Sequence, residues 1–153
     1  MSTASRKLHV AEPPAAYLVR PPMVVDCSAI CGILFDEPWR AEAMSRIAGK
    51  TLYAPYLLDH EVVSVTLKKH RQNWSRESLA GALEDYGQYQ IELRDIDCAG
   101  QFALAQRYKL SAYDAAYLWL AGELRAPLAT FDDKLAAAAR THLAGLPPAS
   151  AQG

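Results

Sequence analysis

Four acidic residues stand where a charged side chain requires an explanation. Asp26, Glu61, Asp114 and Asp132 each lie within an apolar run, just after one, or at the border of an apolar helix face. If folding brings them together, their mutual repulsion favours either proton uptake or the binding of cations. Carboxylate oxygens suit hard divalent cations such as Mg²⁺. The chemistry that this set indicates is the binding of a divalent metal ion.

Asp114 is the only charged residue between Leu110 and Gly122, a segment with the pattern of a buried helix. An ionised carboxylate buried without a partner costs several kcal/mol, so this side chain needs a hydrogen-bonding role or a bound cation. Ser111 and Asp114 fit a capping box, in which the acid satisfies backbone donors at the start of a helix. The sequence leaves both roles open.

Asp26 and Asp132 each follow a short predicted strand. In open α/β sheets ligands bind at the carboxyl ends of the strands, which favours a functional role for both acids. The alternatives are that Asp26 caps the helix that follows it and that Asp132 is a solvated loop residue. Thr130 and Asp133 fit a second capping box, so we expect Asp133 rather than Asp132 to cap the last helix.

Glu61 lies in a predicted helix that begins after Pro55 and carries apolar residues on one stripe. Glu61 borders that stripe, whereas Asp59, two positions earlier, points elsewhere. The alternative is an ordinary solvated residue. Of the two acids, only Glu61 is expected to face inward.

Periodicity and turn residues predict the elements that must position these acids. Strands are predicted near residues 23–26, 51–53, 90–93 and 128–131. Helices are predicted near 28–34, 38–48, 76–86, 99–108, 112–124 and 134–143, with one more carrying Glu61. This alternation implies a parallel sheet.

A length of 153 residues and a hydrophobic content of 51% suffice for one compact domain. We assign this domain to residues 23–145. Residues 1–22 form an N-terminal extension broken by prolines, and a secretory signal is not expected there. Residues 146–153 are expected to be a flexible tail.

Four motifs occur in an order that resembles the PIN domain, specifically a VapC-type toxin ribonuclease. They read MVVDCSAICGILFDEP, APYLLDHEV, and LSAYDAAYLWLA followed by APLATFDDKLAAAA. The similarity spans about Met23 to Leu143. It implies an α/β, PIN-like three-layer fold with a central, mainly parallel sheet flanked by helices.

The resemblance also implies a metal-dependent endoribonuclease that is the toxin of a toxin–antitoxin pair. Its catalytic residues would correspond to Asp26, Glu61, Asp114 and Asp132. Of these, Asp26, Asp114 and Asp132 would bind Mg²⁺ or Mn²⁺, and Glu61 would position metal or water. RNA phosphodiesters would be cleaved by metal-activated water.

Ser28 and Thr130 match supporting polar positions of the family near the acidic site. Ser64 departs from the family, which often has Asn three residues after the glutamate, and the loss of that amide weakens the hydrogen bonding around the site. The alternative function is therefore a catalytically silent PIN-like module for protein interaction.

The formal net charge of −1 is low for an RNA-binding protein. Setting the four acids aside, however, leaves the remaining surface mildly basic. Lys68, Lys69 and Arg71 form a local basic patch and are the candidate RNA-binding residues. The alternative is that these cations merely favour the C-terminus of their helix.

The toxin analogy implies an RNA substrate, a cognate antitoxin protein and a homodimer. No apolar run approaches the roughly 20 residues that a membrane span requires, so no membrane association and a cytoplasmic location are expected. Cys27, Cys31 and Cys98 do not have the spacing of a zinc site with the four histidines. We expect buried free thiols and no disulfide.

Overall fold

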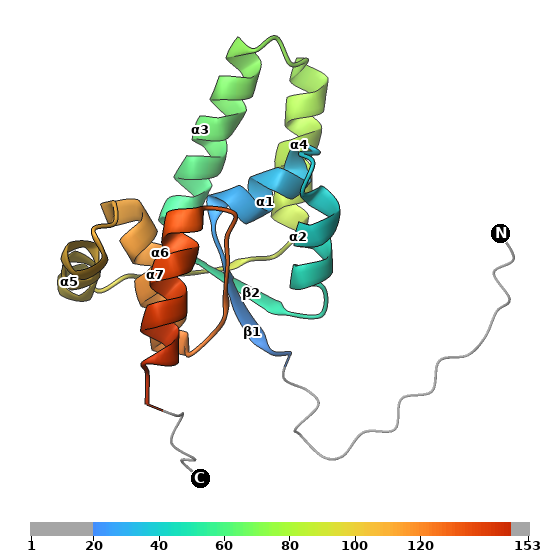
Figure 1. Cartoon of the computed structure of the whole chain (residues 1–153). Coiled ribbons are helices and arrows are strands. Elements are labelled where there is room, and N and C mark those ends of the chain that lie inside the picture. Colours follow the sequence, from blue (N-terminus) through green and yellow to red (C-terminus); the bar gives the residue numbers. More distant parts are fainter. Residues whose placement is uncertain (1–19, 148–153) are drawn as a thin grey trace, which may run out of the picture.

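Four short parallel strands form the centre of the structure, in the order β3-β2-β1-β4 (Figure 1). The computed structural model describes residues 20–147, so most of the predicted extension and tail lie outside the described residues. The strands are β1 (Pro22–Val25), β2 (Thr51–Pro55), β3 (Glu92–Arg94) and β4 (Leu128–Ala129), and all three pairings are parallel. Because β1 lies between β2 and β4, the residue that follows it occupies the middle of the carboxyl edge of the sheet.

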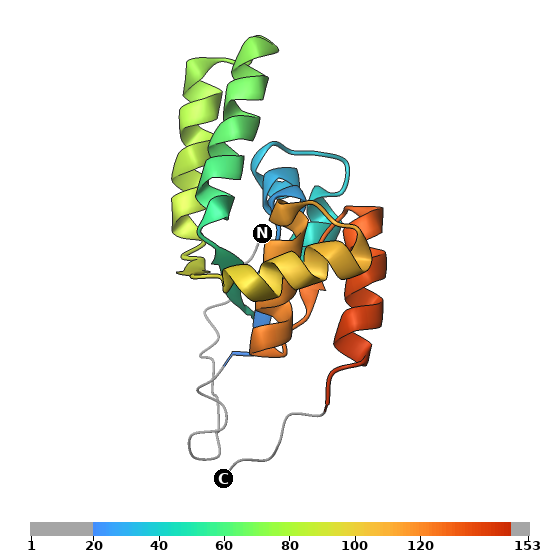
Figure 2. The same cartoon turned by 90° about the vertical axis from the view of Figure 1, so that its left-hand side faces the viewer.

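Helices make every crossover that parallel pairing requires. They are α1 (Cys27–Leu34), α2 (Arg40–Ile47), α3 (Leu57–Arg71), α4 (Arg76–Gln88), α5 (Cys98–Tyr108), α6 (Ala112–Leu124) and α7 (Asp133–Ala144). Helix α6 packs on β1 and β2, and α5 and α7 pack on α6. Helices α3 and α4 both contact α1 and form a hairpin that projects beyond the rest of the chain (Figures 1 and 2). The predicted three-layer α/β fold with a parallel sheet is confirmed.

The core lies between the sheet and these helices. Val24, Val25, Leu58 and Leu118 are fully buried, and Tyr117 of α6 is almost as inaccessible. The helix predicted at 112–124 is thus a central, buried element, as its nearly uncharged sequence indicates. Within residues 20–147 no helix is both long and apolar enough to cross a bilayer.

The bounds of β4 and β3 differ from the predicted bounds for identifiable reasons. Strand β4 ends at Ala129 rather than at Phe131 because the next two residues bond to side chains instead of to a neighbouring strand. Thr130 donates its hydroxyl to Asp26, and the Phe131 N–H donates to Ser28 Oγ at 2.8 Å. Strand β3 begins later than expected because Gln90 has a left-handed backbone, with φ of 50°.

Candidate functional site

Asp26 lies at the carboxyl end of β1 with only 5% of its surface exposed. It is the N-cap of α1, since Oδ1 accepts a hydrogen bond from the Ala29 N–H at 3.0 Å. The same oxygen accepts from Ser28 Oγ at 2.7 Å, and Oδ2 accepts from the Thr130 hydroxyl. Helix capping therefore does not exclude a functional role, because the cap uses one oxygen and leaves lone pairs on the other.

Ser28 and Thr130 link the segments that follow the neighbouring strands β1 and β4, around the carboxylate of Asp26. Both hydroxyls donate to its carboxylate, and each in turn accepts a backbone N–H from the segment after β4. Their oxygens lie 3.4 Å apart. The two residues expected to support the site thus lie in direct contact with Asp26 and hold its orientation.

Asp132, not Asp133, caps the last helix. Asp132 Oδ1 accepts from the Leu135 N–H at 2.7 Å, and Asp133 is the first residue of α7 and is exposed. The predicted capping box of Thr130 with Asp133 is therefore wrong. The reason is a tertiary contact. The Thr130 hydroxyl donates to Asp26 and accepts the Asp132 N–H at 3.0 Å, so it does not cap the helix, and α7 begins at Asp133 rather than at residue 134 as predicted.

Glu61 is half-buried near the start of α3 and faces α6. Its Oε1 accepts a hydrogen bond from the Tyr117 hydroxyl at 2.7 Å. Asp59 is exposed and accepts from Tyr86 of α4 at 2.7 Å. The structure thus separates the two acids as expected, with Glu61 directed inward and Asp59 directed to the hairpin partner.

Asp114 occupies the first turn of α6, one helical turn before Tyr117. Ser111 is the N-cap, and its Oγ accepts the Asp114 N–H at 3.1 Å. The Ser111 hydroxyl performs the capping, so the carboxylate of Asp114 is not required for it. This leaves the carboxylate available for the acidic site.

The four acids interact electrostatically. Burial raises the pKa of Asp26, Glu61 and Asp114 in each case, and neighbouring acids raise it further. Asp26 and Asp114 raise the pKa of Glu61, and Asp132 and Asp26 raise that of Asp114. Side chains from the ends of β1 and β4 and from α3 and α6 therefore form one acidic cluster, the name used below for Asp26, Glu61, Asp114 and Asp132.

The acidic cluster fits a hard divalent cation in donor type and in charge. Its donors are carboxylate oxygens. Burial and the neighbouring acids raise the pKa of three of them despite hydrogen bonds and the charge of Lys134, and a bound cation would favour their ionised forms. Among residues 20–147, no three His, Cys, Asp or Glu side chains converge closely enough to hold a metal ion as they stand. Mg²⁺ keeps several waters in protein sites, so binding by this cluster requires water-mediated contacts or small side-chain movements.

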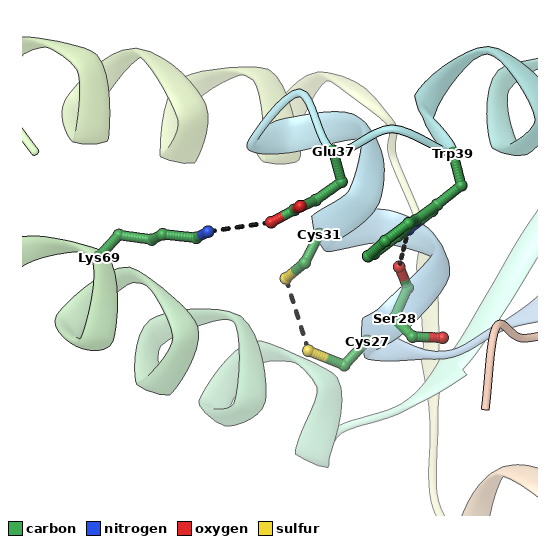
Figure 3. Close-up of polar contacts among 6 residues, drawn as sticks. All are labelled: Cys27, Ser28, Cys31, Glu37, Trp39 and Lys69. Carbon is green, nitrogen blue, oxygen red and sulfur yellow. Dashed lines mark hydrogen bonds and ion pairs between the residues drawn. The ribbon is translucent and has the colours of Figure 1, made fainter. Parts of the chain in front are cut away.

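Two contacts at the cluster were not expected from the sequence. The hydrogen bond from Tyr117 fixes Glu61, and the only signal for it is that Tyr117 follows Asp114 by three residues on the same helix face. Trp39 packs on Phe131 with ring centroids 5.6 Å apart, and its Nε1 donates to the Ser28 carbonyl at 3.4 Å (Figure 3). No spacing rule predicts this aromatic pair.

The basic patch on α3 is only partly free. Lys69 Nζ lies 2.9 Å from Glu37 Oε1 (Figure 3). It also lies 5.1 Å from the centroid of the Trp74 ring. Lys68 and Arg71 are exposed. Lys69 therefore links α3 to the segment after α1 through an ion pair, whereas Lys68 and Arg71 project into the solvent.

The thiols follow the prediction in part. Cys27 and Cys31 are free, with Sγ atoms 3.5 Å apart on one face of α1 (Figure 3). The hydrogen bond with Cys31, together with burial, raises the pKa of the Cys27 thiol. Cys98 is exposed, so the prediction of a buried thiol is wrong there, because Cys98 begins α5 on its outer side.

Comparisons with known proteins identify the fold. A sequence profile of the PIN domain matches residues 23–141. The structure resembles the crystal structure of PAE2754 from Pyrobaculum aerophilum, with a TM-score of 0.61 and 21% sequence identity over 81% of this chain and 93% of that one. No curated protein matches the sequence significantly. The profile match covers most of the chain, and we conclude that it belongs to the PIN domain family, whose members are generally nucleases.

Proposed function

We propose that the chain is a metal-dependent endoribonuclease that uses the acidic cluster to cleave RNA phosphodiesters. The observation that supports this most strongly is geometric. Ser28 and Thr130 join Asp26, at the end of β1, to the segment that carries Asp132, and Tyr117, one helical turn after Asp114, holds Glu61. Acids placed this close to one another, and partly shielded from water, repel one another when they are ionised. A ligand that neutralises the charge gives the cluster a function.

Each acid has a proposed role that follows from its contacts. Asp26 is a buried carboxylate oriented by two hydroxyls, and Asp114 and Asp132 flank it as direct or water-mediated ligands. Glu61, held by Tyr117, positions the metal or a water molecule. When bound, Mg²⁺ or Mn²⁺ supplies charge neutralisation at the phosphate and activation of water for in-line attack.

The biological role that we propose is that of a toxin paired with an antitoxin protein, acting as a homodimer. This rests on the resemblance of the four sequence motifs to VapC-type toxins. Exposed apolar side chains on the α3–α4 hairpin, at Val63, Leu67 and Leu83, are consistent with a protein contact surface there.

The test is cleavage of cellular RNA by the purified chain with Mg²⁺, with Mn²⁺ and with a chelator. We expect cleavage that requires the metal and falls at least about 100-fold in Asp114→Asn, the range seen when one electrostatic group of a catalytic site is removed. Asp133→Asn is the matched control, because Asp133 is exposed, lies beside Asp132 and is absent from the cluster.

Binding of Mn²⁺ by calorimetry provides a second measurement. We expect Asp133→Asn to bind the ion like the unmodified chain and Asp114→Asn to bind it at least tenfold more weakly. A chain that neither binds Mn²⁺ nor cleaves RNA would instead support the catalytically silent interaction module. In that case Ser64, which is exposed on α3 and replaces the asparagine that the family often has there, would be one reason for the loss of activity.

A further inference from the structure

We propose that Trp39 and Phe131 form a platform on which a nucleobase of single-stranded RNA stacks beside the acidic cluster. This inference rests on the proposed function, since it assigns a substrate contact to the same site. Below, these two residues are called the aromatic pair.

The aromatic pair is joined directly to the cluster. Phe131 lies between Thr130, which donates to Asp26, and Asp132. The indole of Trp39 donates to the carbonyl of Ser28, whose hydroxyl also donates to Asp26 (Figure 3). A base stacked on this pair would therefore place its own phosphates next to the carboxylates.

Trp39 is fixed in place while it remains accessible. A side chain at position 32 would displace the indole as it now lies, because a Cβ on Gly32 would collide with Trp39 Nε1. The backbone of α1 thus makes room for the indole, and the Phe131 ring packs on it at an interplanar angle of 39°. Nevertheless 36% of Trp39 is exposed. A rigid, exposed aromatic loses little conformational entropy when a ligand stacks on it.

A groove leads away from the aromatic pair. It is a cavity of about 770 Å³ between α2, β4 and α7, and Thr130 and Phe131 line the end nearest the cluster. Its charged lining consists of Arg46, Lys50 and Arg140 with one acid, Glu42. An excess of cations suits a phosphate backbone, and cations combined with aromatic residues are the usual features of single-stranded nucleic acid sites.

Strand β4 is also the edge strand of the sheet, and among the described residues no strand pairs with its outer side. An apolar peptide strand from a second protein is therefore the competing occupant of the groove. The charge of the groove and its continuity with the acidic cluster favour RNA.

The test uses Asp114→Asn chains, so that the RNA remains intact, and a fluorescently labelled single-stranded oligoribonucleotide followed by anisotropy. We expect Trp39→Leu to raise the Kd about 5- to 150-fold, the effect of losing one base–aromatic stack. Trp39→Phe should recover part of this affinity. Phe102→Leu is the matched control, because Phe102 of α5 is an aromatic residue that is 63% exposed and does not line the groove, and the Kd of this variant should change less than about twofold.

A second measurement reports on Trp39 itself. The chain has three tryptophans, and the double substitution Trp74→Phe and Trp119→Phe leaves Trp39 as the fluorophore. Single-stranded RNA should quench the Trp39 fluorescence to saturation. A duplex of the same sequence should bind at least tenfold more weakly, as judged by the RNA concentration needed for half of the quenching. Arg46→Ala and Arg140→Ala should each reduce the salt dependence of binding by about one phosphate contact.

An unchanged Kd in both Trp39→Leu and Phe131→Leu, with native thermal unfolding, would overturn the proposal. So would self-association of the chain that weakens in these variants while RNA binding does not, since the groove would then be a protein contact. Failure of the proposed function gives a different result, namely RNA that binds and quenches Trp39 but is not cleaved by the unmodified chain with metal.

Discussion

The acidic cluster and the basic end of the α3–α4 hairpin show opposite ways of handling charge. In the cluster, burial and then neighbouring acids raise the pKa of Asp26, Glu61 and Asp114, and none of the salt bridges of the described residues involves a cluster acid. At the hairpin, Lys69 pairs with Glu37 and lies over aromatic rings, while Lys68 and Arg71 are solvated. The comparison indicates that charge is compensated where it is structural and left uncompensated where a ligand is expected.

The largest expected effect comes from removing the centre of the cluster. Asp26→Ala should lower the free energy of unfolding by about 2–4 kcal/mol, because it removes the cap of α1 and leaves the buried donors of Ser28 and Thr130 without their acceptor. Urea denaturation measures this. Asp133→Ala is the control and should cost less than about 0.5 kcal/mol, as expected for an exposed residue. A loss for Asp26→Ala as small as that of the control would show that the hydrogen bonds around Asp26 contribute little.

The next effect depends on pH and metal. The pKa values of Asp26, Glu61 and Asp114 are raised in the folded chain, so the folded state binds more protons than the unfolded state above the ordinary carboxyl pKa. Stability from these groups is therefore complete below that value and is lost as the pH rises through the raised values. We expect the metal-free chain to become less stable as the pH rises from the ordinary carboxyl pKa of about 4 towards neutrality.

Mn²⁺ at neutral pH should restore this stability, by about 2.7 kcal/mol at 100 times its Kd. Denaturation with a chelator and with Mn²⁺, at several pH values, measures both effects. Asp114→Asn should flatten the pH dependence and remove most of the response to Mn²⁺. A metal-free chain that gains stability as the pH rises through this range would contradict the account of the cluster.

The smallest effect concerns the hairpin. Lys69→Met should lower the free energy of unfolding by about 0.5–1 kcal/mol, because it breaks a partly shielded ion pair. Lys68→Met should leave stability within about 0.5 kcal/mol, since Lys68 is exposed. RNA binding by Lys68→Met and by Arg71→Ala tests whether the patch contacts RNA. Such a role predicts a higher Kd for both variants without loss of stability. Equal stability of Lys69→Met and Lys68→Met would show that the ion pair of Lys69 with Glu37 does not stabilise the fold.

Much of the fold could be predicted because its signals are local. Helix α6 was predicted at 112–124 and is found at Ala112–Leu124, since its cap, apolar pattern and end all lie within about 15 residues. The parallel sheet followed from the alternation of strands and helices. Strand β4 was predicted too long because the partners of Thr130 and Phe131 belong to the other end of the chain.

The sequence by itself determined the type and order of the elements and the four acids worth attention, because these depend on neighbours a few positions apart. Only the tertiary structure decided which groups those acids meet. Asp26 meets Thr130 across 104 positions, Glu61 meets Tyr117 across 56, and Lys69 meets Glu37 across 32. Such contacts depend on which strands and helices become neighbours, and that arrangement follows from burial of the whole apolar core rather than from any local pattern.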